Sequence, residues 1–199
     1  MAGIKNSLRG VTQKWGTMRL KRSLWNKEFA EGRWAFIEST SNDVVYPILE
    51  KYCRTGSLLD LGCGSGNTGC ELNGDSYQEY TGVDISDIAI SKAKERSDAC
   101  HRSAKNRYEQ SDIQSYEPSR KYDVILFRES IYYIPQTRIN SVLKRYAQCL
   151  KPGGVIVVRT HSLEAGEPIL AGLGADFRIA EKSMIENGPL VAVLSPAGP

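Results

Sequence analysis

The amino-acid sequence predicts an α/β fold built on a seven-stranded, mostly parallel, doubly wound sheet. Two observations support this. From Ser57 onward, short apolar runs alternate with longer stretches of helical periodicity, which is typical of strand-helix-strand units that build a parallel sheet. The last two predicted strands are joined by a linker that is too short for a parallel crossover of a dozen or more residues. We therefore expect the terminal strand to run antiparallel.

Length and composition indicate a single folded domain. The 199 residues are enough for one hydrophobic core. With 41% hydrophobic and 25% charged residues, the chain has the composition of a globular protein, which excludes a disordered or fibrous protein. No apolar run approaches the roughly 20 residues that span a bilayer, and charges interrupt the N-terminus where a signal peptide would need an apolar stretch. We expect a cytoplasmic protein without a membrane span.

The first half of the predicted sheet contains three strands and two helices. Strands are expected at 57–61, 80–84 and 108–110, with helices at 67–72 and from 86 to about 98. Glycines open the first of these helices. Ser86 is the predicted N-cap of the second, because a serine oxygen can accept a hydrogen bond from an unpaired N–H of the first helical turn.

The second half continues the alternation and ends in a hairpin. The continuous apolar run at 122–127 predicts a strand that is buried on both faces. A helix from about 137 to 150 should end at Lys151-Pro152-Gly153-Gly154, since proline and glycine stop a helix and turn the chain. The remaining elements are a strand at 155–160, a short helix at 163–173, a strand at 176–183, a turn at 187–189 and a strand at 190–194.

The residues before Asp43 are predicted to form a helical arm, 1–42, ahead of a domain that covers 43–199. An apolar stripe recurs at spacings of four and three, which lines it along one helix face. It consists of Ile4, Leu8, Val11, Trp15 and Met18. The glycines at 3, 10 and 16 argue against a rigid helix. Residues 1–33 hold eight lysines and arginines against two glutamates, a net charge of +6.

The cysteines and histidines predict neither a metal site nor redox chemistry. Five cysteines are scattered without Cys-x-x-Cys spacing, and only His101 and His161 provide imidazoles. The cysteines are Cys53, Cys63, Cys70, Cys100 and Cys149. We expect all five to be reduced thiols and expect no bound metal.

Asp60-Leu61-Gly62-Cys63-Gly64-Ser65-Gly66 joins the first strand to a helix and predicts a ligand-binding turn. Glycines here leave backbone N–H groups free and place no Cβ in the way of a ligand. The segment 64–69 also fits the G-x-G-x-x-G pattern of dinucleotide enzymes, a weak signal by itself. Asp60 favours a different ligand, because its carboxylate would repel a pyrophosphate and attract a cationic amino-acid tail.

Two further acids follow neighbouring strands. Asp84 ends the second strand about 20 residues after the turn, where an acid can accept hydrogen bonds from ribose hydroxyls. Asp112, after the third strand, can bind an exocyclic adenine amine, and Ile113 beside it can pack against the ring. Together with Asp60, these side chains indicate a ligand that combines adenosine with a cationic amino acid.

Five motifs in the expected order resemble those of class I S-adenosylmethionine-dependent methyltransferases. They lie at 58–66, 82–86, 111–113, 122–127 and 150–154. The resemblance covers about 43–194 and implies a Rossmann-like sheet with an antiparallel last strand. It also implies S-adenosylmethionine as methyl donor, with S-adenosylhomocysteine as product.

The resemblance further implies roles for individual residues. Gly62, Gly64 and Gly66 would approach the aminocarboxypropyl group, with Cys63 in the same turn and Arg128 at the end of the fourth strand. Asp84 would bind the ribose, Ile85 and Ile113 would flank the adenine, and Asp112 would meet its amine. Arg33, near the domain start, is expected to reach the carboxylate of the cofactor.

The methyl acceptor is expected beyond the carboxyl ends of the strands, around 128–133 and 160–162. Methyl transfer is an in-line displacement that needs alignment first and a base only when the acceptor must lose a proton. Glu129 and His161 are the candidate catalytic residues, and histidine is the better base because it titrates near neutral pH. The alternatives are that Glu129 organises the pocket wall and that His161 is a polar loop residue.

Aromatic side chains provide candidate substrate contacts. Trp34, Tyr132 and Tyr133 can form a wall that attracts an amine through cation–π contacts, unless one of the tyrosines belongs to the core. Nothing like the Asn/Asp-Pro-Pro-Tyr motif of nucleic-acid and protein amide methylation follows the fourth strand. We therefore expect a small-molecule nitrogen or oxygen acceptor, and a monomer or homodimer.

The basic N-terminal arm leaves other functions open. Its cations are Lys5, Arg9, Lys14, Arg19, Lys21 and Arg22. They can contact phosphates or an anionic membrane surface. Alternatively, the arm is a lid that packs its apolar stripe over the cleft and leaves its charges in solvent, which we prefer. The rival functions are an RNA methyltransferase steered by this arm and a non-catalytic S-adenosylmethionine-binding module that contacts a protein partner.

Overall fold

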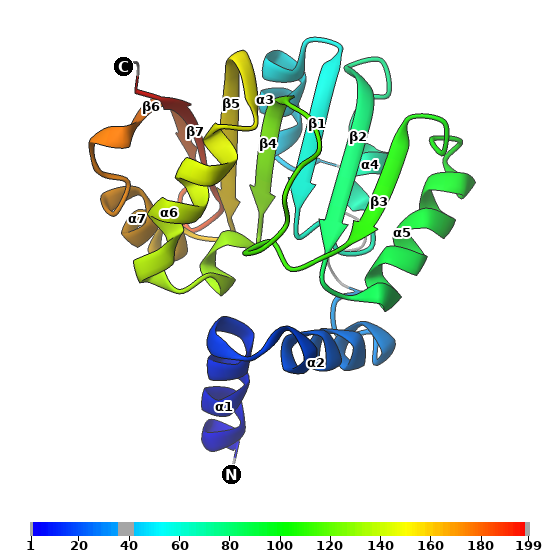
Figure 1. Ribbon diagram of the computed structural model, residues 1–199, viewed down its shortest axis with the longest axis vertical. Helices are drawn as coiled ribbons and strands as arrows, with labels where there is room; N and C mark the ends of the chain where they lie inside the picture. Colours follow the sequence, from blue (N-terminus) through cyan, green and yellow to red (C-terminus); the bar gives the residue numbers. More distant parts are fainter. Residues whose placement is uncertain (1, 36–41, 198–199) are drawn as a thin grey trace.

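The computed structural model describes residues 2–35 and 42–197, with side chains from residue 8 onward. Its strands form one sheet in the order β3-β2-β1-β4-β5-β7-β6 (Figure 1). The strands are β1 (Gly56–Leu61), β2 (Tyr77–Asp84), β3 (Asn106–Gln110), β4 (Tyr122–Arg128), β5 (Leu150–Thr160), β6 (Phe177–Met184) and β7 (Leu190–Pro196). The predicted α/β class with seven strands is confirmed.

The direction of the last strand also agrees with the prediction. β1 pairs in parallel with β2 and β4, and β2–β3 and β4–β5 are parallel as well. β7 lies between β5 and β6 and runs antiparallel to both, with Ile156 opposite Leu194 and Phe177 opposite Pro196. The short connection from β6 through Asn187 and Gly188 makes the predicted hairpin.

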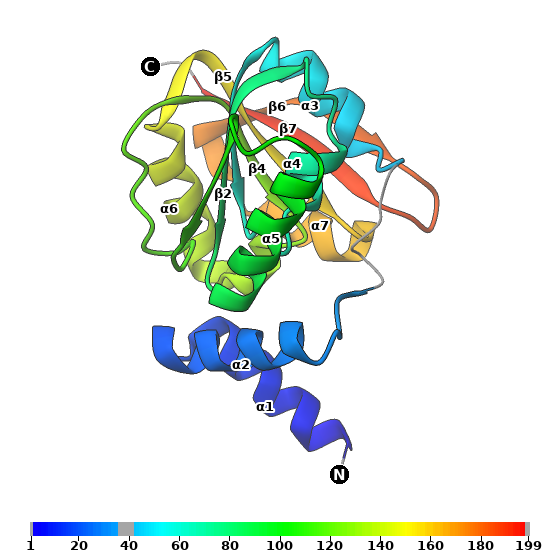
Figure 2. The same ribbon diagram turned by 90° about the vertical axis from the view of Figure 1, so that its right-hand side faces the viewer.

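Helices cover both faces of the sheet (Figure 2). The described helices are α1 (Ala2–Trp15), α2 (Met18–Ala30), α3 (Val45–Cys53), α4 (Asn67–Glu71), α5 (Asp87–Ala99), α6 (Gln136–Ala147) and α7 (Leu163–Ala171). α6 and α7 share one buried cluster with Leu59 and Ile125, whereas α3 and α5 share another with Leu58 and Val124. Alternate residues of each strand thus point to opposite faces, as the pleat requires.

Local signals explain the ends of several helices. The Ser86 side chain accepts a hydrogen bond from Ala89 N at the start of α5, so the predicted cap is confirmed. Ser162 caps α7 in the same way, with Ala165 N as donor. The boundary after α6 differs from the prediction.

The prediction that Lys151-Pro152-Gly153-Gly154 separates a helix from a strand is wrong. α6 already ends at Ala147, and these residues lie inside β5, which begins at Leu150 opposite Tyr122. The register between β4 and β5 shifts after Tyr122. Gly153 has φ +77°, so an irregular piece of strand is accommodated without a side chain in a strained conformation.

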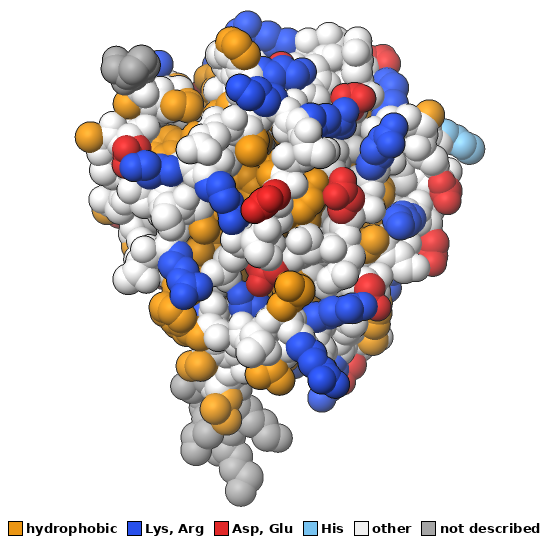
Figure 3. Space-filling view, viewed as in Figure 1, with side chains coloured by type: hydrophobic (Ala, Val, Ile, Leu, Met, Phe, Trp, Pro, Cys, Tyr) orange, Lys and Arg blue, Asp and Glu red, His pale blue; other side chains and the backbone are white. Residues whose placement is uncertain are grey.

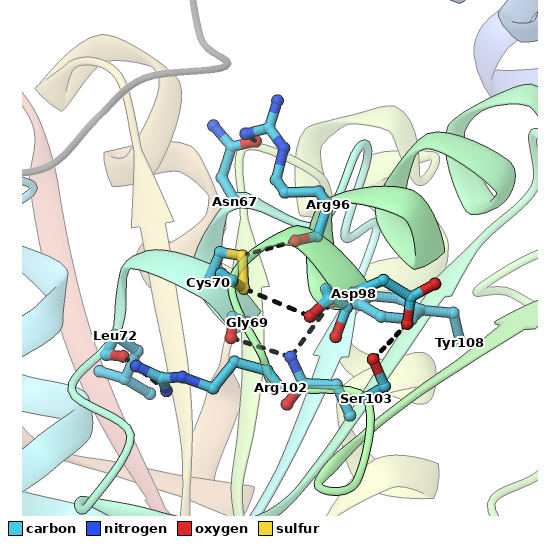
Figure 4. The surroundings of a disulfide bond; sticks show 12 residues. Asn67, Gly69, Cys70, Leu72, Arg96, Asp98, Arg102, Ser103 and Tyr108 are labelled. Carbon is cyan, nitrogen blue, oxygen red and sulfur yellow. Dashed lines mark hydrogen bonds between the residues drawn. A yellow bond between two sulfur atoms is a disulfide. The ribbon is translucent and has the colours of Figure 1, made fainter.

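A disulfide joins Cys70 to Cys100, with their Cα atoms 6.1 Å apart, so the expectation that all cysteines are reduced is wrong for this pair. Figure 4 shows the bond between α4 and the end of α5. Cys70 belongs to α4, and Cys100 is the C-cap of α5. The two residues are 30 apart in sequence, and only the side-by-side packing of α4 and α5 brings them together. Cys53, Cys63 and Cys149 are free thiols.

Removing this disulfide is expected to lower the free energy of unfolding by about 2–4 kcal/mol, because the cross-link restricts the unfolded chain. The test is urea denaturation of the double variant Cys70→Ser/Cys100→Ser without reductant. Cys149→Ser, at a half-buried free thiol, is the control and should change little. Equal stability of the double variant and the unreduced wild type would contradict the structural role of the bond.

Two features of the fold determine where the candidate site lies. The parallel strands all end at the same edge of the sheet, and α1 and α2 lie beyond that edge in both views (Figures 1 and 2). α2 contacts α5, and α1 packs on α2. No helix within residues 2–35 and 42–197 is long and apolar enough to cross a bilayer.

Candidate ligand-binding and catalytic site

A cavity of about 630 Å³ lies between α2 and the carboxyl ends of the parallel strands. This position is where open α/β sheets bind their ligands. The volume falls within the range of about 300–1,000 Å³ that is usual for small-molecule sites. Its walls come from the glycine turn, the segments that follow β2 to β5, and the two N-terminal helices.

The glycine turn curls tightly around the end of β1. Gly62, Gly64 and Gly66 have φ of +84°, +53° and +81°, a conformation that favours glycine. A Cβ on Gly62 would lie 2.4 Å from the Cβ of Ser130. The N–H groups of Gly62 and Cys63 donate to Val83 O, at 2.7 and 3.0 Å, which ties the turn to β2. The turn therefore presents backbone rather than side chain to the cavity.

Asp60 brings a buried carboxylate to the cavity wall. Its Oδ2 accepts a hydrogen bond of 2.7 Å from the Tyr80 hydroxyl. Its Oδ1 is buried and has no hydrogen-bond partner among the described residues. Burial raises the pKa of Asp60 from its ordinary value. A cationic ligand group beside Oδ1 would supply the missing donor, so the residues present fit a ligand with an ammonium group.

Asp84 is the second buried acid of the cavity. Its Oδ2 accepts from Gly64 N at 3.0 Å and its Oδ1 from Ser86 N at 2.9 Å. These bonds fix the carboxylate at the end of β2, while burial raises its pKa to about 6. Ile85 and Ile113 also line the cavity, as expected for side chains that hold a planar group.

Asp112 has a partner that the sequence did not reveal. Lys21 of α2 forms a buried ion pair with it, with Nζ 3.1 Å from Oδ2. Asp112 Oδ1 accepts from Gln114 N at 2.9 Å. Lys21 is followed at spacings of four by Trp25 and Phe29, and all three line the cavity. This helical spacing was the signal in the sequence that would have identified the covering face of α2.

The predicted apolar stripe of the arm is divided between α1 and the start of α2 and does not cover the cavity, so that part of the lid prediction is wrong. Leu8, Val11, Trp15 and Met18 are each more than half exposed, and the side chain of Ile4 lies outside the described residues. The charges of the arm are not all in solvent either. Arg9 binds the buried carboxylate of Glu28 through two nitrogens, and that carboxylate also accepts from Trp34 Nε1 at 3.1 Å. Ion pairing, rather than the stripe, holds the arm in place.

Arg22 completes the attachment of α2 to the body of the protein. Its Nε lies 2.9 Å from Asp87 Oδ1, which also accepts from Asn26 at 2.6 Å. These bonds hold the pKa of Asp87 at about 2, well below the ordinary value. Because Asp87 opens α5, the helix that follows β2, α2 is held beside the site of Asp84.

Aromatic side chains form another part of the cavity wall. Trp25 packs edge-on against Tyr133 at 4.8 Å between ring centroids and lies 5.7 Å from Trp34. Tyr132 contacts Tyr133 at 4.7 Å. The three predicted aromatic residues are thus brought together, with neither tyrosine fully buried in the core, and Trp25 joins them from α2. Burial raises the pKa of Tyr133 to about 12.

Glu129 and His161 meet at this wall. Glu129 Oε2 lies 3.1 Å from His161 Nδ1 and accepts a hydrogen bond of 2.6 Å from the Tyr132 hydroxyl. Arg159 donates to Oε1. The φ of Glu129 is +55°, an uncommon conformation for a side chain of this size. The carboxylate is therefore held on both oxygens, and the imidazole, largely exposed at the cavity mouth, is oriented by it.

Two arginines behave differently from the sequence prediction. Arg128 lines the cavity, but its guanidinium is engaged by buried Asp43, with Nη2 2.8 Å from Oδ2. Arg159, which the sequence analysis missed, shares that carboxylate at 3.2 Å. Arg33 is exposed in the turn after α2 and is not among the residues of the cavity wall, so the structure does not support a contact with the cofactor. Its backbone N–H donates a hydrogen bond of 3.1 Å to Glu28 O.

No metal centre is evident in the part of the chain that the structure describes. Among residues 2–35 and 42–197, no group of three or more histidine, cysteine, aspartate or glutamate side chains is placed to hold an ion.

The chain is similar in sequence to known methyltransferases. Residues 59–156 match the family model described as a methyltransferase domain. A ubiquinone biosynthesis O-methyltransferase from Bradyrhizobium sp. is 32% identical over 126 residues, 63% of this chain and 48% of the relative. A 27-O-demethylrifamycin SV methyltransferase from Amycolatopsis mediterranei is 26% identical over 179 residues, 86% of this chain and 63% of the relative.

A solved structure shows the same fold. The N-methyltransferase NodS from Bradyrhizobium japonicum, in complex with S-adenosyl-L-homocysteine, superposes with a TM-score of 0.71 at 17% identity, covering 89% of this chain and 98% of NodS. The chain spans only about half the length of the ubiquinone biosynthesis relative that it matches.

Proposed function

We propose that the chain is a class I S-adenosylmethionine-dependent methyltransferase and that it transfers a methyl group from S-adenosylmethionine to a nitrogen or oxygen of a small molecule. The match of residues 59–156 to a methyltransferase domain and the 32% identity to a ubiquinone biosynthesis O-methyltransferase support this proposal. The observation that carries this proposal is the single cavity that contains both sets of groups. The glycine turn with its acids lines this cavity, and so do Glu129 and His161. The proposed functional units are a covering arm, 1–42, and a catalytic domain, 43–199.

The residues of the first set fit the cofactor group by group. Asp60 Oδ1, which lacks a partner among the described residues, would accept a hydrogen bond from the ammonium of the amino-acid tail. Asp84 would accept hydrogen bonds from the ribose hydroxyls. Ile85 and Ile113 would enclose the adenine, with Asp112 beside its amine. Gly62, Cys63, Gly64 and Gly66 would allow the backbone to approach the tail. When bound, S-adenosylmethionine supplies an electrophilic methyl group on its sulfonium.

The residues of the second set would prepare the acceptor. Glu129 accepts from His161 Nδ1, which leaves Nε2 to accept a proton from an acceptor hydroxyl or ammonium. Tyr132 and Arg159 hold Glu129 in this orientation. Trp34 and Tyr133, with Trp25, would pack on the acceptor and exclude water. We infer that Glu129 orients the base and that His161 removes the proton.

The arrangement of the arm favours a small molecule over RNA. Arg9, Lys21 and Arg22 are engaged by Glu28, Asp112 and Asp87, so these three cations are not free to contact phosphates. The paired Glu129 and His161 in the same cavity also favour catalysis over cofactor binding alone. The small-molecule nature of the acceptor is consistent with the names of the ubiquinone and rifamycin relatives.

The test is incubation of the protein with S-adenosylmethionine that carries a radiolabelled methyl group, together with a metabolite extract and with an RNA extract. We expect label to enter the small-molecule fraction. Label in RNA alone would reject the proposed acceptor class, and cofactor binding without label in either extract would favour a non-catalytic module. Boiled protein provides the background.

Asp84→Ala is expected to weaken S-adenosylmethionine binding by on the order of 10²-fold, because hydrogen bonds to a charged group are lost. Isothermal calorimetry measures this, with Asp75→Ala at an exposed loop as the control. An unchanged affinity would refute the role of Asp84.

The pKa of Asp84, about 6, also predicts a pH dependence. Hydroxyl donors favour the ionised carboxylate, so binding should release a proton, and affinity should fall by about tenfold between pH 7 and pH 5. The folding stability of the free protein changes with pH in the opposite direction. Because the pKa of Asp84 is raised in the folded protein, ionising Asp84 lowers the free energy of unfolding as pH rises through about 6. Asp60 titrates in the same direction, and Asp84→Asn should therefore lessen the pH dependence of binding without removing it. A variant with the full dependence of the wild type would contradict this assignment.

A further inference from the structure

An apolar patch on the N-terminal arm has no function in the site described above. It consists of Leu8, Val11 and Trp15 on α1 with Met18 and Leu20 on α2, each more than half exposed. We call these five residues the arm patch. Figure 3 shows hydrophobic side chains gathered at the lower end of the molecule, where α1 lies. Five of the eight large hydrophobic side chains that are exposed in the described residues belong to it. Leu8, Val11 and Trp15 are spaced three and four residues apart and therefore share one face of α1, and an exposed apolar face of this kind is typical of an interaction surface.

Positive charge lies beside the arm patch. The first 27 residues contain seven lysines and arginines and no aspartate or glutamate. Lys14 and Arg19 are exposed beside the patch residues, and neither forms an ion pair with any residue that the structure describes. Arg138 of α6 extends the charge onto the body, with its guanidinium carbon 5.5 Å from the centroid of the Trp15 ring. The arm therefore presents exposed apolar side chains together with neighbouring cations.

The arm is held so that the patch faces outward. Lys21 and Arg22 bind Asp112 and Asp87 on the body, and Arg9 binds Glu28 between the two helices. These ion pairs use the inner side of α2, next to the cavity. α1 projects from the body in both ribbon views and packs on α2 (Figures 1 and 2). The patch is thus presented to the surroundings close to the cavity.

We propose that the arm patch docks the protein on an anionic lipid bilayer surface, with α1 lying in the interface. A helix with apolar side chains on one side and lysine and arginine around them binds such surfaces, because apolar burial and attraction to anionic headgroups act together. Tryptophan is favoured at the boundary between headgroups and acyl chains. Docking would place the cavity near molecules dissolved in the membrane.

Charge and polarity argue against the other occupants of the patch. A second copy of the chain would bring the cations beside two arm patches together, and like charges across an interface disfavour association. A nucleic acid would contact Lys14 and Arg19 but would leave Leu8, Val11 and Trp15 in water. An anionic bilayer satisfies both parts of the patch.

The experiment measures co-sedimentation of the whole chain with vesicles of phosphatidylcholine alone and of phosphatidylcholine mixed with phosphatidylglycerol. We expect binding to the mixed vesicles to be at least about tenfold stronger. Leu8→Ser/Val11→Ser should reduce that binding by about tenfold or more. Ile179→Ser/Met184→Ser, at exposed apolar residues of β6, is the matched control and should bind like the wild type.

Charge-reversal variants separate the electrostatic contribution to vesicle binding from the contribution of apolar burial. Lys14→Glu/Arg19→Glu should remove the preference for the anionic vesicles, whereas Lys121→Glu, at an exposed lysine just before β4, should keep it. None of these residues lines the cavity, so cofactor binding by calorimetry should be unchanged in every variant and reports that each is folded. The vesicle assay needs no methyl transfer, so its outcome is independent of the proposed reaction.

Any of four outcomes would overturn the proposal. One is equal binding of the wild type to neutral and anionic vesicles, and a second is equal losses in the patch variants and their controls. Another is a dimer in light scattering that Leu8→Ser/Val11→Ser dissociates, which would identify a second copy as the occupant. The last is RNA binding that depends on Lys14 and Arg19 while vesicle binding is absent.

Discussion

Replacing Glu129 by glutamine is expected to lower kcat by about 10²- to 10⁴-fold, the usual contribution of acid–base catalysis. The amide keeps the shape of the side chain but loses the charge that holds the imidazole of His161 and accepts from Arg159 and Tyr132. Asp60 and Asp84 are left in place, so the affinity for S-adenosylmethionine should stay close to that of the wild type. A loss confined to kcat is what distinguishes a role in proton removal from a role in folding.

The measurement is steady-state kinetics on the acceptor identified by the labelling experiment, as a function of pH. His161→Asn should give a loss of similar size, and the double variant should lose little more, because residues that act as a unit are not additive. Glu117→Gln, at an exposed position in the loop before β4, is the control. An unchanged kcat in Glu129→Gln, or a drop in cofactor affinity as large as the drop in kcat, would contradict the assignment.

Gly62→Ala is expected to lower the free energy of unfolding by on the order of 2–4 kcal/mol and to abolish measurable cofactor binding. The first cause is φ +84°, which disfavours any Cβ, and the second is the 2.4 Å separation between that Cβ and the Cβ of Ser130. Ser130 itself donates to Leu61 O, so it cannot move aside without breaking a buried hydrogen bond. The turn would have to open, and the backbone that faces the cavity would move with it.

Gly153→Ala separates the two causes. Gly153 has φ +77°, but a Cβ there meets no atom within 4 Å. This control should lose only the conformational cost, about 1–2 kcal/mol, and should bind the cofactor like the wild type. Urea denaturation of both variants gives the stabilities, and calorimetry gives the affinities. Equal effects in the two variants would show that the close approach to Ser130 is unimportant.

The outline of the fold could be predicted because its signals are local. The apolar run at 122–127 and the cap at Ser86 depend on neighbours within a few residues, and they were correct to within a residue or two. Where pairing with another strand determines the start of a strand, the prediction was wrong. β5 starts at Leu150 because Tyr122 of β4 lies opposite it, which no pattern within 150–154 reveals.

The residues of the candidate site likewise fall into two groups, those that could be predicted from the sequence and those that could not. Asp60 and Asp84 lie at the carboxyl ends of predicted strands, and Asp112 follows another. Because parallel strands bring their carboxyl ends to one edge of the sheet, the meeting of these acids at one cavity could be expected. Lys21 is 91 residues from Asp112 and comes from a helix outside the sheet. Trp25 and Arg159 were missed for a similar reason, because their importance lies in the partners that packing gives them.

The order of the strands and helices, the antiparallel end and the glycine turn with its acids could all be predicted, because periodicity, capping and chain direction act over short stretches. The packed structure was needed to show which face of the arm covers the cavity, which two cysteines meet, and that Glu129 is held by His161, Arg159 and Tyr132. Each of these depends on contacts between segments that are far apart in the chain. Burial and charge across the whole molecule determine such contacts, and a short stretch of residues is not enough to predict them.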